Sequence, residues 1–189
     1  MKTEKEKMLG GELYNAYDPE LTASRVRAKS LCKRLNDLDV GRQDERARLM
    51  RELFSHPLNN FQKLIVEPVF FCDYGVNIRF GDNVYFNHNC VILDAAPVVI
   101  GSNVLFGPGV HLYTSTHPLD PDVRRSGLES AHPIEIGSDV WMGGGAIVCP
   151  GVKIGSGAVI GAGSVVTKDI PEGAVAVGNP CREIKRVRA

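Results

Sequence analysis

A polar loop near the middle of the chain carries the histidine with the best prospects for chemistry. The loop covers about residues 113–133 and contains the stretch TSTHPLDPDVRR, in which His117 stands directly before a proline. Long loops on regular scaffolds are usually functional, and imidazole is the side chain best suited to take a proton near neutral pH. We therefore predict that His117 acts as a general base, although a loop histidine can also merely cap a turn.

The residues on both sides of this loop follow a six-residue period. Hexads of the form aliphatic-Gly-x-x-small-x run as IGSNVL and FGPGVH before the loop, and as IGSDVW, MGGGAI, VCPGVK, IGSGAV, IGAGSV and VTKDIP after it. The first residues of the later hexads share one phase: Ile136, Met142, Val148, Ile154, Ile160 and Val166. FGDNVY and FNHNCV follow the same rule two residues out of phase, which predicts a small insertion near residues 95–97.

This period predicts a parallel β-helix. Each hexad supplies one short strand and one corner, with its first residue and its small fifth residue pointing into the core. Pairs such as Ser102-Asn103, Gly144-Gly145 and Ser156-Gly157 have the composition of corners. Stacked coils then satisfy one another's backbone groups as parallel ladders. An antiparallel β-sandwich is the alternative, but a period of six without alternation disfavours it.

The N-terminal part has helical rather than six-residue spacing. Residues 1–60 are expected to form a helical cap, and residues 61–189 the β-helix domain with its excursion near 113–133. The first predicted helix begins at Asp18-Pro19 and ends near Gly41, with an apolar stripe of Leu21, Val26, Leu31, Leu35 and Leu38. The second covers residues 44–54, buries Ala47, Leu49, Met50, Leu53 and Phe54, and stops at His56-Pro57.

Charge and cysteine content narrow the classes of function. Lys plus Arg and Asp plus Glu number 22 each, so no basic field favours nucleic acid or an anionic membrane. The five cysteines are scattered and never form a CxxC pair, which is typical of reduced thiols. MKTEKEKMLGGE lacks an apolar signal core, and no later apolar run is long enough to cross a bilayer. These features predict a cytoplasmic protein.

An ordered set of stretches across almost the whole chain resembles the maltose and galactoside O-acetyltransferases, within the hexapeptide-repeat acyltransferases. The stretches are YNAYDPEL, RVRAK, CDYGVNIRFGDNVYFN, ILD, PGVHLYTSTHPLD, IGSDVWMGGGAIVCPGV, IGAGSVVTKDIP and VGNPCREI. The resemblance implies direct transfer of an acetyl group from acetyl-CoA to a sugar hydroxyl, as in maltose, glucose or a galactoside. It also implies a homotrimer with active sites between subunits, and a left-handed coil, whereas general topology favours right-handed crossovers.

The resemblance also implies roles for individual residues. His117 matches the catalytic histidine of the family, and the backbone N–H of Gly144 is the expected donor to the developing oxyanion. The implied acceptor-binding residues are Asp18, Arg25, Tyr85, Asn87 and Asp94, with Glu129 as a further candidate in the returning arm of the loop. The implied acetyl-CoA-binding residues are Trp141, Gly144, Ala162, Thr167, Lys168, Arg182 and Lys185.

Several alternatives stay open at this point. Ala95 stands where some galactoside-type relatives carry a second acidic residue, which favours a maltose-type acceptor. Asn87 and Asp94 could simply hold corners or turns, and Trp141 could pack a trimer. The acceptor could carry an amino group or be no sugar at all. A zinc-dependent hydratase could share His88, His111 and His117 across an interface, but no spacing demands a metal and we predict none. A non-catalytic scaffold is the last alternative.

Overall fold

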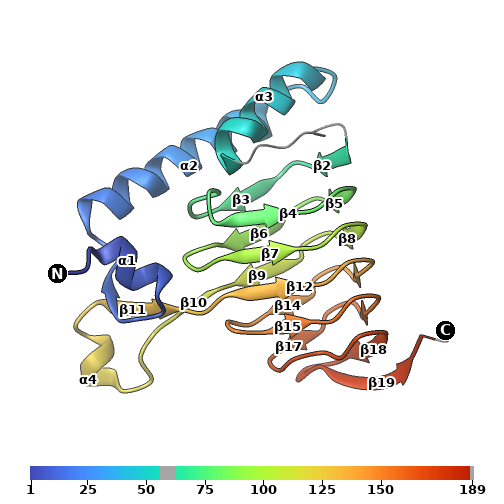
Figure 1. The fold of residues 1–189 in the computed structure, drawn as a ribbon. Coiled ribbons are helices and arrows are strands. Elements are labelled where there is room, and N and C mark those ends of the chain that lie inside the picture. The colour runs from blue at the N-terminus through green and yellow to red at the C-terminus, as the bar shows by residue number, and fades with distance from the viewer. Residues whose placement is uncertain (56–62, 188–189) are drawn as a thin grey trace.

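The hexads form short strands that stack into three parallel sheets, as the period predicts. The computed structural model describes residues 1–55 and 63–187. Face 1 contains β2 (Leu64–Val66), β5 (Val84–Phe86), β8 (Val104–Phe106), β13 (Trp141–Met142), β16 (Val159–Ile160), β18 (Ala174–Val177) and the antiparallel β19 (Arg182–Arg186). Face 2 contains β3 (Phe70–Cys72), β6 (Cys90–Leu93), β9 (His111–Tyr113), β14 (Ile147–Val148) and β17 (Val165–Val166). Face 3 contains β4 (Ile78–Phe80), β7 (Val98–Ile100), β12 (Ile134–Ile136) and β15 (Lys153–Ile154). The rod is therefore triangular, with helices over one end (Figure 1).

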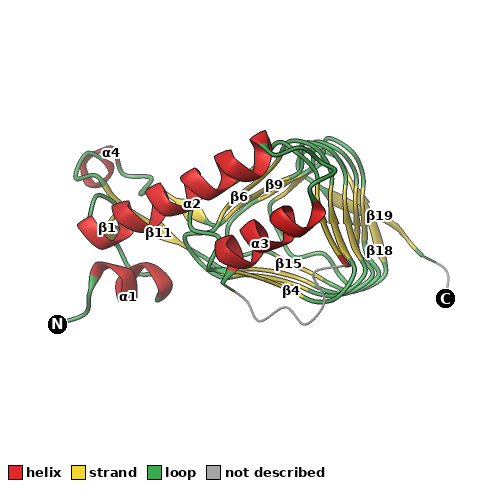
Figure 2. Ribbon diagram, turned by 90° about the horizontal axis from the view of Figure 1, so that it is seen from above, coloured by secondary structure: helices red, strands yellow, loops and turns green. Residues whose placement is uncertain are grey.

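The coil is left-handed. Seen from the helical end, the chain passes from face 1 on the right to face 2 at the top and face 3 at the bottom, and it recedes from the viewer (Figure 2). A path that turns counterclockwise while receding is left-handed. The β-helix thus has the hand implied by the family resemblance, which the general preference for right-handed crossovers does not predict.

The core follows the predicted hexad phase. The six in-phase residues from Ile136 to Val166 are each at most 3% exposed. The small fifth residues are buried as well, including Ala146, Ala158 and Ser164. At the corners, Asn103 and Gly145 have φ angles of 58° and 69°, a left-handed conformation that suits Asn and Gly. The residues that the hexad phase places in the core are therefore the ones that are buried along the rod.

The N-terminal part contains three helices: α1 (Glu4–Leu9), α2 (Pro19–Asp37) and α3 (Gln43–Phe54). α2 and α3 lie over the end of the rod, whereas α1 lies at its side (Figure 1). The bounds of α2 and α3 are close to prediction, and α1 was not predicted. Val26 does not belong to the buried stripe of α2, because it is 59% exposed while Ala28 and Cys32 face the rod. The predicted domain boundary after residue 60 and the His56-Pro57 stop lie outside the described residues. None of the described helices is long and apolar enough to span a membrane.

The excursion leaves the rod between β9 and β12, at the corner of faces 2 and 3. It contains β10 (Ser115–Thr116), α4 (Pro121–Arg124) and β11 (Leu128–Ala131). β11 pairs antiparallel with β10 and also with β1 (Tyr14–Asn15), which follows α1. This small sheet joins the excursion to the N-terminal cap beside the rod (Figure 1).

Candidate active site

A polar cleft opens where the cap, the first coil and the excursion meet. Its volume is about 260 Å³, and it is lined by Tyr14, Ala16, Tyr17, Arg25, Lys29, Asp73, Tyr74, Ala95, Ser115 and Glu129. Two of the predicted acceptor-binding residues, Arg25 and Glu129, therefore line the same cleft although they are distant in sequence. Both signs of charge face this cleft.

Hydrogen bonds orient the charged groups of the cleft. The guanidinium of Arg25 donates to the Tyr74 hydroxyl at 2.7 Å and to the carbonyl of Ala16, and it lies 5.8 Å from the centre of the Tyr74 ring. Glu129 stands opposite Tyr14 in the β1–β11 pair. Burial raises the pKa of the Tyr14 hydroxyl far above its usual value, and the Glu129 carboxylate adds to the shift. The hydroxyl therefore stays protonated and can donate to that carboxylate.

Asp73 and Lys29 are cleft residues that the sequence interpretation missed. Asp73 follows β3 directly, and Lys29 lies one helical turn after Arg25 on α2. Burial raises the pKa of Asp73, while Lys29 and Arg25 act in the opposite direction. The signal was available in CDYG, where a carboxylate follows a short buried strand and precedes an aromatic residue. Without the fold, however, nothing in the sequence placed that strand next to α2.

His117 lies one residue beyond β10 and is exposed. The pairing of Thr116 with Ser130 fixes the backbone before it. Beyond it, Arg124 donates to the carbonyls of Pro118 and Leu119, each at 3.0 Å. Within the described parts of this chain the imidazole has no hydrogen-bond or ion-pair partner. The ring is therefore held on a fixed backbone with both nitrogens available.

Asp18 has a structural task and a spare oxygen. Its Oδ1 accepts from the backbone N–H groups of Glu20 and Leu21, at 2.9 and 3.4 Å, and so caps α2. Neither of these bonds uses Oδ2. The side chain is half-buried near the cleft wall formed by Tyr17 and Arg25, so the cap does not preclude the predicted contact with an acceptor.

Asp94, which was predicted to contact an acceptor, holds a turn in this chain. Asp94 is fully buried, and its carboxylate accepts from the backbone N–H groups of Asp73, Tyr74 and Asn77 at 3.0, 2.8 and 3.4 Å. Burial raises the pKa of Asp94 to about 7. Asp94 therefore positions the segment that carries Asp73, as the turn-holding alternative predicts, while its contact with an acceptor stays a prediction.

The other predicted residues lie on the far side of the rod. Tyr85 pairs with Leu105 on face 1, and Leu105 pairs with Trp141, so the three form one outward column. Asn87 and Gly144 occupy the corner between faces 1 and 2, where the amide oxygen of Asn87 accepts from the N–H of His88 at 2.7 Å. The excursion projects from the opposite corner (Figure 2). One chain alone therefore does not bring these residues to His117.

The predicted acetyl-CoA residues lie on the later coils and are mostly exposed. The N–H of Gly144 donates to no acceptor among the described residues. Ala162 is one coil below Gly144, since the N–H of Gly163 donates to the Gly144 carbonyl at 2.9 Å. Thr167 and Lys168 follow β17, at the corner of faces 2 and 3, while Arg182 and Lys185 lie on β19. The set is thus spread over two corners and the terminal hairpin.

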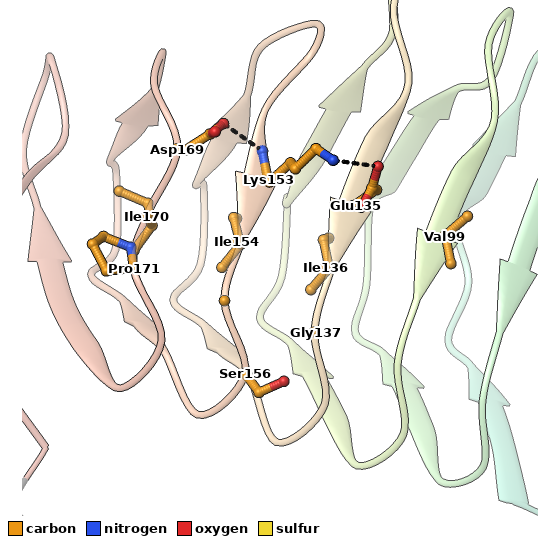
Figure 3. A pocket seen from close by; sticks show the side chains of 11 residues that line it. Val99, Glu135, Ile136, Gly137, Lys153, Ile154, Ser156, Asp169, Ile170 and Pro171 are labelled. Atoms are coloured by element: carbon orange, nitrogen blue, oxygen red, sulfur yellow. Dashed lines mark hydrogen bonds and ion pairs between the residues drawn. The ribbon is translucent and has the colours of Figure 1, made fainter.

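The outward surfaces of the three faces differ in character. On face 1, Ile65, Leu105 and Trp141 are 50%, 49% and 56% exposed, and on face 2 Phe71 is 49% exposed. Face 3 is charged: a groove of about 500 Å³ contains the ion pair between Lys153 and Glu135 at 2.9 Å (Figure 3). None of the predicted site residues lines that groove. Faces 1 and 2 are therefore the apolar sides of the rod.

Comparisons with known proteins bear on the whole chain. The maltose acetyltransferase hexapeptide capping motif matches residues 7–57, and the bacterial transferase hexapeptide (six repeats) matches residues 133–168. Nodulation protein L of Rhizobium meliloti is 48% identical over 96% of this chain and 97% of its own length.

Two solved structures extend the likeness to the fold. A maltose O-acetyltransferase from Clostridium difficile superposes with a TM-score of 0.95 at 45% identity, over 100% of this chain and 99% of that one. A hexapeptide-repeat acetyltransferase from Vibrio cholerae, in complex with acetyl-CoA, gives a TM-score of 0.88 at 38% identity over 100% of both chains. The chain belongs to the maltose acetyltransferase family of hexapeptide-repeat acyltransferases, enzymes whose cosubstrate is acetyl-CoA.

Proposed function

We propose that this protein transfers the acetyl group of acetyl-CoA to a hydroxyl group of a sugar, with His117 as the general base. The observation that carries the proposal is the position of a histidine without partners beside a polar cleft. Ser115 lines the cleft, and His117 directly follows β10, so the imidazole is attached two residues from the cleft wall. A hydroxyl bound in the cleft mouth is then within reach of the imidazole.

The chemistry follows from these groups. Neutral His117 takes the hydroxyl proton while the acceptor oxygen attacks the thioester carbonyl carbon. The carbon–sulfur bond breaks, and the protonated imidazole returns its proton to the leaving thiolate. The N–H of Gly144, which has no acceptor among the described residues, is suited to donate to the carbonyl oxygen as negative charge develops there. No acyl-enzyme is required.

The cleft suits a polyol. The carboxylates of Asp73 and Glu129 accept hydrogen bonds from hydroxyl groups, and the cations of Arg25 and Lys29 balance their charge. A neutral acceptor with many hydroxyl groups therefore fits better than an anion or a cation. The 45% identity to a maltose O-acetyltransferase supports a sugar of that type. No feature of the cleft favours an amino acceptor instead.

A homotrimer completes the site in this proposal. In a closed ring each subunit presents two different surfaces, one to each neighbour, and faces 1 and 2 are the two apolar sides of the rod. The column of Tyr85, Leu105 and Trp141 on one subunit then meets the excursion of the next. Ala162, Thr167, Lys168, Arg182 and Lys185 are proposed to bind acetyl-CoA along the same interface, with the basic residues on its phosphates. The five free cysteines suit the proposed cytoplasmic location.

The zinc alternative lacks support in the described parts of the chain. No group of three or more His, Cys, Asp or Glu residues there could hold a metal ion. The Nδ1 atoms of His88 and His111 already contact the Pro68 carbonyl and the Tyr113 hydroxyl. No observation favours a second function over acetyl transfer.

The test is thiol release from acetyl-CoA with maltose, glucose, galactosides, serine and chloramphenicol as acceptors, and with His117→Ala as the control. Release with sugars that the variant abolishes is the expected result. If the protein binds CoA but no sugar stimulates release, the proposed acceptor class is wrong. Release that persists in the variant would instead remove the general-base assignment.

A further inference from the structure

Two buried cysteines from distant parts of the chain lie side by side behind the cleft. Cys32 on α2 and Cys72 at the end of β3 have their Sγ atoms 3.7 Å apart, and the residues are 1% and 4% exposed. The other cysteines have no such neighbour: Cys90 contacts the carbonyl of Gly107, and Cys149 is only half-buried. The pair is thus the one place in the described structure where two thiols meet.

Hydrogen bonds between the Asn36 side chain and the backbone of Phe70 hold the helix and the strand together next to the pair. Asn36 lies one helical turn after Cys32, and Phe70 lies two residues before Cys72 on the same side of β3. The Asn36 amide donates to the Phe70 carbonyl and accepts from the Phe70 N–H, both at 2.9 Å. This clamp holds α2 and β3 at a fixed separation. The sulfur atoms, 3.7 Å apart, must approach to about 2.05 Å to form a disulfide, and the clamp keeps the two elements that carry them close together for that step.

We propose that Cys32 and Cys72 form an oxidation site, at which a peroxide converts the two thiols into a reversible disulfide between the cap and the first coil. Nothing in the acetyl-transfer proposal requires this reaction, so the two proposals stand or fall separately.

The reaction is balanced with hydrogen peroxide as the oxidant. The Cys32 thiolate attacks one peroxide oxygen, the oxygen–oxygen bond breaks, and hydroxide leaves with a sulfenic acid formed at Cys32. The Cys72 sulfur then attacks the Cys32 sulfur, and the sulfenic oxygen leaves as a second water once it is protonated. Two thiols are oxidised and one peroxide is reduced to two waters.

The environments of the two thiols suit this order. The hydrogen bond from Cys72 lowers the pKa of Cys32, whereas the pKa of Cys72 is raised by that bond and by burial. Cys32 is therefore the thiol that ionises first and attacks the oxidant. Because both residues are buried, a small oxidant and a local opening of the cap are needed for access.

The link would join two walls of the cleft. α2 carries Arg25 and Lys29, while Asp73 and Tyr74 directly follow Cys72. A disulfide there closes a loop between residues 32 and 72 and restricts the unfolded chain. Oxidation is therefore expected to stabilise the cap without changing the composition of the cleft.

The experiment treats the full protein with a small excess of hydrogen peroxide, then denatures it, alkylates the free thiols and maps peptides without reduction. We expect a peptide pair that joins Cys32 to Cys72, an intact mass lower by two hydrogens, and a melting temperature higher by about 5–15 °C. Dithiothreitol should reverse all three changes. Cys32→Ala and Cys72→Ala should abolish them, whereas Cys149→Ala, the matched control, should not.

The proposal is overturned if Cys149 becomes oxidised while Cys32 and Cys72 both remain open to alkylation. It is equally overturned if peroxide treatment yields no peptide that joins Cys32 to Cys72. Reversal by dithiothreitol in the unmodified sequence keeps the test valid even where an alanine variant folds poorly.

Discussion

Burial separates the roles of the carboxylates around the cleft. Asp94 has no exposed surface and binds three backbone N–H groups, so it shapes the turn that presents Asp73. Asp73 and Glu129 line the cleft itself. The sequence alone shows acidic residues in the motifs of the family but not which of them reach the surface, because depth depends on contacts between segments far apart in the chain.

His117→Ala tests the general-base role. We expect turnover to fall by about two to four orders of magnitude, because the acceptor hydroxyl loses the group that takes its proton. Binding of acetyl-CoA, measured by calorimetry, should remain within about twofold of the unmodified protein. Equal losses in turnover and in CoA binding would show that the residue holds the site together and does not transfer the proton.

Asp94→Asn tests the turn-holding role through pH. Burial raises the pKa of Asp94 in the folded protein from 3.8 to about 7, so the folded state binds its proton more tightly than the unfolded state does. This contribution to the free energy of unfolding is fully present below about pH 4 and is lost as the pH rises through about 7. The Asp94→Asn variant lacks this titrating group, so its free energy of unfolding does not contain this pH-dependent contribution.

Urea unfolding at several pH values measures that difference. Between about pH 4 and pH 8, the free energy of unfolding of the original protein should fall by on the order of 2–4 kcal/mol more than that of the variant. If the free energy of unfolding depends on pH in the same way in both proteins, the carboxylate is ionised throughout this range and is stabilised by its three N–H donors.

At the scale of elements, the repeat could be predicted in detail and the cap only in part. Each hexad carries its own strand, corner and core residue, so period and phase sufficed for the rod. α2 and α3 followed from helical spacing, but Val26 was misplaced in the stripe because the side of α2 that is buried depends on where β3 lies. β1 and β11 were not predicted, because such short strands carry no pattern of their own and form only by pairing with each other across the fold.

This pairing ties the cap to the segment that carries His117, and its removal is a test at this scale. A variant that begins at Ala16 lacks α1 and β1, so β11 and β10 lose their outer support. We expect turnover to fall at least about tenfold, because small displacements of a catalytic group are costly. Hydrogen exchange in residues 114–133 should rise, while exchange in the later coils stays unchanged. A matched variant that lacks only the first three residues should behave like the full chain.

At the scale of the whole molecule, the residues proposed for the active site lie on opposite sides of one rod. His117 and the polar cleft lie on the side of the excursion, whereas Asn87 and the Tyr85–Trp141 column lie across the rod. In the proposed trimer, the apolar faces 1 and 2 serve as the two different contact surfaces that a closed ring requires. If each active site combines His117 of one copy with Asn87 of its neighbour, two different defects can complement each other.

His117→Ala and Asn87→Ala, each nearly inactive alone, should therefore regain activity when their subunits are mixed at random in one trimer. A site is intact only where a subunit with its own His117 precedes one with its own Asn87, which occurs at one of the three interfaces, about one third, in every trimer that holds both variants. Coexpression with two different tags, followed by purification of doubly tagged trimers and a thiol-release assay, measures the recovery. The wild-type protein mixed with the double variant is the matched control, and its doubly tagged trimers retain about one sixth of their sites if each site needs two copies, because only a trimer with two wild-type subunits holds an intact interface. If both residues instead serve one site within one copy, the mixture of single variants regains nothing and the control keeps about half of its activity, because every wild-type subunit then stays functional whatever its neighbours are.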